Sequence, residues 1–195
     1  MRSSTEFVAA RMGPPMRVLE RHPFVEEMVA HWGTALGGAR AAYSGHAYRV
    51  LNYARALIGT ERHDAELALA AAYHDLGIWS DRTFDYLGPS QQRAEAFRRE
   101  GAPDIDAELL ALLIKDHHLL RRPRTGSEPA LRDAFRRADL VDVSGGTLRA
   151  GLPAALVREV EHAFPYQGFH GILLKTAFHW AVRHPFRPLP MLRVR

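Results

Sequence analysis

Two polar residues, His74 and Asp75, stand near the end of the apolar stretch ELALAAAYHDLGIW. A charged group beside so many alanines and leucines must be neutralised or coordinated where it is buried. A divalent metal ion does both, because it binds a neutral imidazole nitrogen and a carboxylate oxygen. The same dipeptide occurs as His63-Asp64 in ERHDAE, a polar stretch typical of a solvated helix start. The apolar context therefore singles out His74 and Asp75 as candidate metal ligands.

Further candidate ligands occur in three other segments with the apolar spacing of helices. His46 lies near the start of SGHAYRVLNYARALIG, where a lone histidine could equally be a core residue. His117 and His118 follow an apolar run in ELLALLIKDHHLLRR, and Asp139 lies in LRDAFRRADLVDVSGG. Helical bundles build metal sites from side chains that several helices direct inward. The four segments together therefore indicate one shared site.

Some of these residues have competing interpretations. Asp139 could pair with Arg136 on its own helix instead of binding a metal. Asp142 lies about one turn after Asp139, and we expect it to orient a ligand or cap the helix. Consecutive residues of a helix point about 100° apart. We therefore expect one of His117 and His118 to face the site and the other to face the surface or the core.

The order and local context of these residues resemble the HD superfamily of metal-dependent phosphohydrolases. The matching motifs are H-x-x-R-V-x-x-Y-A around His46, A-x-x-H-D-L-G around the His-Asp dyad and A-D-L around Asp139, within residues 44–145. The resemblance implies an all-α fold, a single-domain helical bundle of the HD-domain type. It also implies that His46, His74, Asp75 and Asp139 bind a metal.

The chain lacks two features that other members of that superfamily have near the metal site. Two-metal members place another histidine between the dyad and the later His pair, but none occurs between His74 and His117. We therefore expect one divalent transition metal (Mn, Fe, Co, Ni or Zn), with His117 and His118 lining the pocket. Several hydrolytic relatives carry an acid within a turn after the dyad, where this chain has Ile78 and Trp79.

The expected function is hydrolysis of a nucleotide or another small phosphoester by water that the metal activates. By analogy with the superfamily, Asp75 would be both a ligand and the acceptor of the water proton. His117 or His118 could protonate the leaving oxygen. Two alternatives stay open: a hydratase, lyase or di-iron oxygenase on the same scaffold, and a non-catalytic module that senses a nucleotide.

Basic side chains near the candidate ligands favour a phosphorylated substrate. Arg49 lies three residues after His46, and Lys115 and Arg121 flank the histidine pair. Such cations bind phosphate and stabilise the charge that develops on it. The net charge of the whole chain is +4, and several basic stretches are interleaved with acids. They indicate solvated helix faces rather than a nucleic-acid interface.

Length and composition predict one globular domain, since the chain has 195 residues, of which 47% are hydrophobic and 25% charged. We expect an N-terminal arm over 1–22, the helical domain over 23–184 and a basic C-terminal tail over 185–195.

No apolar run is long enough to span a membrane and no signal peptide is recognisable, so we expect a cytoplasmic protein without a membrane partner. The absence of cysteine leaves histidine, carboxylates and water as metal ligands. A homo-oligomer stays open.

The positions of several aromatic and apolar residues predict whether they line the pocket or belong to the core. Trp79 and Tyr86 could stack a nucleobase or, alternatively, cover the core from outside. On the last helix we assign Ile172, Leu173, Phe178 and Trp180 to the core. Pro, Gly and apolar spacing predict helices from Pro23 to about Gly37, from about Ser44 to Gly59, from Glu61 or Arg62 past Asp75 to Gly77, from Pro89 to Arg99, from after Pro103-Asp104 to His118, and over about 131–143, 151–164 and 168–184.

Overall fold

The computed structural model describes residues 17–192, and within that range all regular structure is helical. The elements are α2 (Pro23–Leu36), the 3-10 turn η1 (Gly37–Ala39), α3 (Arg40–Ile58), α4 (Asp64–Tyr73), α5 (Gly77–Ser80), α6 (Leu87–Gly101), α7 (Ala107–Asp116), α8 (Pro129–Val143), α9 (Ala154–Ala163) and α10 (Phe169–Arg183). The prediction of an all-α, single-domain bundle is confirmed. No helix in this range has the length and apolarity needed to cross a membrane. The first sixteen residues of the predicted arm lie outside the described range.

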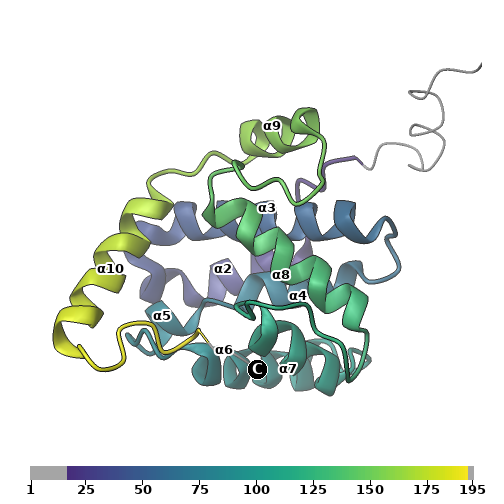
Figure 1. Ribbon diagram of the computed structural model, residues 1–195. Helices are drawn as coiled ribbons and strands as arrows, with labels where there is room; N and C mark the ends of the chain where they lie inside the picture. The colour runs from purple at the N-terminus through teal and green to yellow at the C-terminus, as the bar shows by residue number, and fades with distance from the viewer. Residues whose placement is uncertain (1–16, 193–195) are drawn as a thin grey trace, which may run out of the picture.

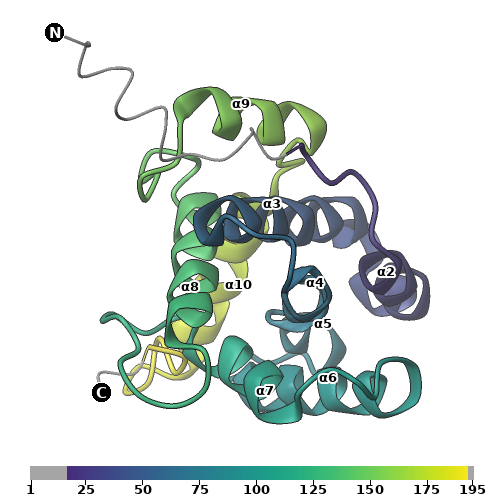
Figure 2. The same cartoon turned by 90° about the vertical axis from the view of Figure 1, so that its right-hand side faces the viewer.

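Helix α4 occupies the centre of the bundle. Every residue from Leu67 to Tyr73 is buried, which fits a stretch that is rich in alanine and can be approached closely from all sides. In Figure 2, α3 lies above α4, α2 to its right and α6 and α7 below it, while α8 packs against α3 (Figures 1 and 2). The His-Asp dyad at the end of α4 therefore lies where several helices meet.

Helix α3 begins earlier than the sequence suggested. Its first residue is Arg40 rather than a residue near Ser44, because Gly37–Ala39 forms a single 3-10 turn that leads from α2 directly into α3. His46 consequently lies in the second turn of α3, where it is fully buried. The helix ends as predicted at Gly59, whose φ of 72° is left-handed and whose N–H donates to the Arg55 carbonyl.

A close backbone contact places the loop after the dyad. A Cβ on Gly77 would lie 2.7 Å from the carbonyl oxygen of Tyr86, so only glycine fits there. The Gly77 N–H also donates to Ser90 Oγ at 3.0 Å. These two contacts hold the segment before α6 against the end of α4, and they bury Tyr86.

The C-terminal segment packs against the domain. Met191 is buried with Ile78 and Phe84 in a small apolar cluster, so the described part of the predicted tail, 185–192, folds back towards α5. The assignment of Phe178 to the core was wrong, since its side chain is 68% exposed. Helix α10 instead packs through its inner face, where Phe169 is fully buried.

An ion pair fixes α7 against α8. Arg132 on α8 donates through two nitrogens to Asp116, the last residue of α7, and both side chains are buried. A further nitrogen of Arg132 donates to the carbonyls of Thr125 and Ser127 in the connecting loop. Asp116 precedes the histidine pair, so this contact also sets where that pair lies.

Asp116→Ala should lower the free energy of unfolding by about 3 kcal/mol, because removal of one partner leaves the buried Arg132 charge without its carboxylate. Urea denaturation followed by circular dichroism measures the change. Asp104→Ala is the matched control: Asp104 is exposed and makes no ion pair with another described residue, so it should cost less than about 0.5 kcal/mol. Equal losses in the two variants would contradict the structural role of the pair.

Candidate metal centre

The four metal ligands expected from the sequence come together at one buried point. His46 comes from α3, His74 and Asp75 from the end of α4, and Asp139 from α8. His46 Nε2 lies 2.9 Å from His74 Nε2 and 3.6 Å from Asp75 Oδ2. Asp139 Oδ1 lies 3.6 Å from His74 Nε2 and 3.9 Å from His46 Nε2. Each of the four residues is at most 3% exposed.

The two histidine rings are oriented with Nε2 inward. His46 Nδ1 lies 2.6 Å from Asp142 Oδ2, and His74 Nδ1 lies 3.0 Å from the Ala71 carbonyl oxygen. Because both partners only accept, each Nδ1 carries a hydrogen and donates it. Neutral rings then direct two Nε2 lone pairs at one another across 2.9 Å. Such an arrangement requires a proton or a metal cation between the two nitrogens.

The composition of the cluster favours a metal cation over a single proton. Asp75 Oδ1, His117 Nε2 and Asp139 Oδ1 are buried and have no hydrogen-bond partner among the described residues. One proton cannot satisfy these atoms as well as the two histidines, whereas a metal accepts several ligands at once. With the imidazoles in the neutral form that binds a metal, the carboxylates of Asp75, Asp139 and Asp142 face only one buried guanidinium, that of Arg49, and two negative charges stay uncompensated. The residues therefore fit a divalent ion.

Burial and neighbouring charges oppose one another in setting the protonation of the cluster. Burial by itself would lower the pKa of His46, but the hydrogen bond with Asp142 and the nearby carboxylate of Asp75 raise it to about 9. Burial would raise the carboxyl pKa of Asp75, yet the adjacent His74 and the other imidazoles hold it well below its ordinary value. The pKa of Asp139 is likewise lowered, because the His74 ring 3.6 Å away and the other nearby imidazoles outweigh its burial. Both carboxylates are thus ionised at neutral pH, the form that binds a cation.

Arg49 has a different role from the one expected. The sequence suggested that it binds a phosphate, but its side chain is fully buried and forms a bidentate pair with Asp142. Its remaining nitrogen donates to the carbonyl oxygens of Phe164 and Pro165 at 2.9 and 3.2 Å. With its donors already used, Arg49 holds Asp142 in place rather than reaching a substrate. Asp142 in turn orients His46, as the sequence suggested for an orienting carboxylate.

His117 and His118 both face the cluster, contrary to the expectation that one would point away. Helix α7 ends at Asp116, so the two histidines lie on the turn that follows and the 100° helical offset does not apply. One ligand atom from each of Asp75, His117 and His118 lies within 4.8 Å of the others, as also holds for His46, His74 and Asp75. Asp75 therefore belongs to two groups that could each hold an ion.

Tyr86 covers the cluster from the loop after the dyad. It is 2% exposed, and its hydroxyl lies 2.5 Å from His118 Nε2. Burial raises the pKa of Tyr86 well above its ordinary value, so the hydroxyl stays protonated and donates to His118. Burial and the positive charge of His117 lower the pKa of His118 to about 4. Tyr86 is thus too buried to stack a nucleobase. Trp79 is half-buried and packs on Tyr43 with ring centroids 4.7 Å apart, as the alternative of covering the core requires.

The remaining sequence candidates lie around this centre. Lys115 is half-buried on α7 and Arg121 is exposed just beyond the histidine pair, and neither makes an ion pair with another described residue. Asp139 does not pair with Arg136, which binds Asp133 instead. His63, at the start of α4, lies near Glu66 and takes no part in the cluster.

Sequence reasoning missed one contact that holds the site. The ring of Phe169 on α10 stacks on His46, with centroids 4.2 Å apart and planes 18° apart. A single phenylalanine at the start of a predicted amphipathic helix carries no signal that it will cover a histidine more than one hundred residues earlier in the chain. Only the packing of α10 against α3 reveals it.

No protein-family model, curated protein or solved structure matches this chain. The interpretation of the site therefore depends on the geometry of the described residues.

Asp142→Asn should weaken metal affinity by about 10- to 100-fold, because the uncharged amide no longer fixes the proton of His46 on Nδ1. Competition with a chromophoric chelator for Zn²⁺ or Co²⁺ measures the affinity. Asp133→Asn removes a carboxylate from the same helix that binds Arg136 instead, and it should leave the affinity unchanged. An unaltered affinity in folded Asp142→Asn would show that this hydrogen bond does not support the site.

Proposed function

We propose that the chain is a metal-dependent hydrolase of a small phosphoester, with one divalent transition metal held by His46, His74, Asp75 and Asp139. The observation that carries the proposal is the meeting of two inward Nε2 atoms with two ionised carboxylates inside the bundle. The ligand set suits Mn, Fe, Co, Ni or Zn. The resemblance of the surrounding motifs to the HD superfamily supports the same reaction class.

A divalent metal supplies Lewis acidity, which activates water as a nucleophile and polarises a phosphoryl oxygen. Asp75 is the residue placed to take the proton of that water, because Oδ2 faces His46 and His74 while Oδ1 has no hydrogen-bond partner among the described residues. The nearest acid after the dyad, Asp81, is unsuited to this task. It is exposed and binds Arg93 at 3.0 Å.

His117 is the proposed proton donor to the leaving oxygen. Its Nδ1 donates to the Ile114 carbonyl, so its Nε2 faces Asp75 Oδ1 across 3.4 Å. Burial would lower the pKa of His117, but Asp75 and Asp139 raise it above the ordinary value, which favours a ring that can donate. The short distance also lets Asp75 return the proton of the water to His117 after each turnover.

The proposed substrate is a small phosphorylated molecule, of which a nucleotide is one candidate. Lys115 and Arg121 lie on either side of the histidine pair in the chain and have no competing carboxylate within ion-pair distance among the described residues. They are the cations left to bind the phosphate once Arg49 is committed to Asp142.

One observation favours a second candidate, a two-metal reaction such as that of a di-iron oxygenase. Asp75 is shared between the group with His46 and the group with His117 and His118, which is how a carboxylate comes to serve two neighbouring ions. The number of metal ions separates the candidates. About two irons per chain, with oxygen uptake and no phosphoester cleavage, would replace the hydrolase by this second function.

The proposal predicts that the metal-loaded protein cleaves 4-nitrophenyl phosphate, bis(4-nitrophenyl) phosphate or a nucleotide. Each of the five candidate metals is supplied in turn, and release of nitrophenol or phosphate is followed. His74→Ala should reduce turnover to the uncatalysed rate, because it removes one of the inward Nε2 atoms.

The matched control is His63→Ala, which removes the other His-Asp dyad of α4 and should retain the wild-type rate. Circular dichroism verifies that both variants are folded. Equal rates in His74→Ala and wild type, or no cleavage with any of the metals, would refute the hydrolase.

A further inference from the structure

A separate cleft lies between α10 and the segment that follows α5. It has a volume of about 470 Å³, which is within the range that small-molecule sites occupy. The lining side chains come from α10 and from the segment 78–84, and they include Arg82, Phe84, Lys175, Trp180, Arg183 and His184. None of the residues of the candidate metal centre lines it.

The cleft is cationic, and the described part of the chain offers its cations no carboxylate. Arg82, Lys175 and Arg183 each lack an ion pair with any residue of 17–192, and no acid is among the lining residues. The two acids nearest in sequence are engaged elsewhere, since Asp81 binds Arg93 at 3.0 Å and Asp85 lies 3.8 Å from Arg187. The sequence contains no acid after Glu161. An anionic ligand would therefore meet uncompensated positive charge.

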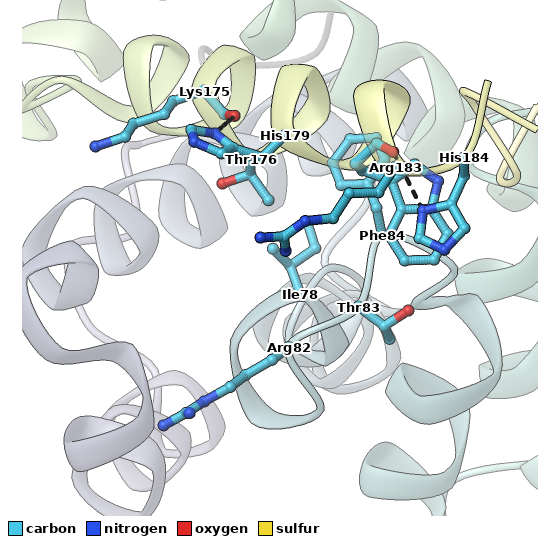
Figure 3. A pocket seen from close by; sticks show the side chains of 10 residues that line it. Ile78, Arg82, Thr83, Phe84, Lys175, Thr176, His179, Arg183 and His184 are labelled. Carbon is cyan, nitrogen blue, oxygen red and sulfur yellow. Dashed lines mark hydrogen bonds between the residues drawn. The ribbon is translucent and has the colours of Figure 1, made fainter.

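The charges and the apolar surfaces of the cleft are separated (Figure 3). Lys175 and Arg82 lie towards one end, on opposite sides and with their charged groups pointing outward, and the guanidinium of Arg183 lies between them. Phe84 and His184 lie towards the other end. His184 stacks on Trp180 with ring centroids 3.7 Å apart, and Ile78 and Phe84 are buried, so that end is aromatic and apolar.

We propose that this cleft binds a small amphipathic anion, with its phosphate, sulfonate or carboxylate group at Arg183, flanked by Arg82 and Lys175, and its planar apolar part against the stacked pair of Trp180 and His184. Guanidinium groups bind such oxyanions through paired hydrogen bonds. Aromatic side chains bind the planar part by stacking. The inference is independent of the metal chemistry, because the cleft contains none of the candidate ligands.

Isothermal titration calorimetry tests the proposal with two anionic probes, ADP and 1-anilinonaphthalene-8-sulfonate. At least one should bind at about one equivalent, and adenosine and inorganic phosphate, which each carry half of the ADP chemistry, should bind more weakly than ADP. Arg183→Glu should weaken the anion by about tenfold or more, because it replaces a charge-assisted hydrogen bond by repulsion. Response to ADP identifies a phosphate-bearing ligand, whereas response to the sulfonate alone identifies a planar anion of another kind.

Two variants serve as controls. Arg158→Glu makes the same charge change on an exposed arginine of α9 outside the cleft and should bind like wild type. His74→Ala should also bind like wild type, even where it abolishes phosphoester cleavage, so that failure of the hydrolase and failure of the cleft are distinguishable. The proposal is overturned when neither anion binds, when Arg183→Glu and Arg158→Glu bind equally, or when binding is lost in His74→Ala.

Discussion

The buried carboxylate of Asp142 is the contact on which the rest of the site depends. It accepts from His46 and from Arg49, so one charge joins α8 to two successive turns of α3. Arg49 extends the connection to the carbonyls of Phe164 and Pro165, between α9 and α10. An unpaired buried guanidinium or carboxylate would lower the free energy of unfolding by several kcal/mol, and pairing offsets most of that loss. The helices can therefore pack in this way only when both groups are paired. The orientation of the His46 ring follows from that requirement.

The candidate ligands were predictable from the sequence because their chemical type conflicts with their surroundings. His74 and Asp75 follow the alanine-rich part of α4, whereas His63 stands in the polar stretch at the start of the same helix. Burial is what distinguishes them, and hydrophobic context reports burial well. The all-α fold was predictable for the same reason, since apolar spacing defined most helices. The starts of helices were less certain, as the 3-10 turn before α3 illustrates.

Contacts between residues far apart in the chain could not be predicted from the sequence. Arg49 has the spacing of a phosphate ligand, and only its pairing with Asp142 shows that its donors are used. His117 and His118 both face the cluster because α7 ends at Asp116, before the pair, so the geometric argument for two residues within a helix does not apply to them. The stack of Phe169 on His46, and the cationic cleft beneath α10, join segments that lie far apart in the chain.

The central claim is that the buried cluster of His46, His74, Asp75 and Asp139 holds a metal ion. Elemental analysis of protein purified without chelator, and again after reconstitution, tests it most directly. The account predicts about one transition-metal ion per folded wild-type chain and essentially none in folded His74→Ala. Absence of metal from the wild type even after reconstitution, or retention of the full metal content by His74→Ala, would contradict it.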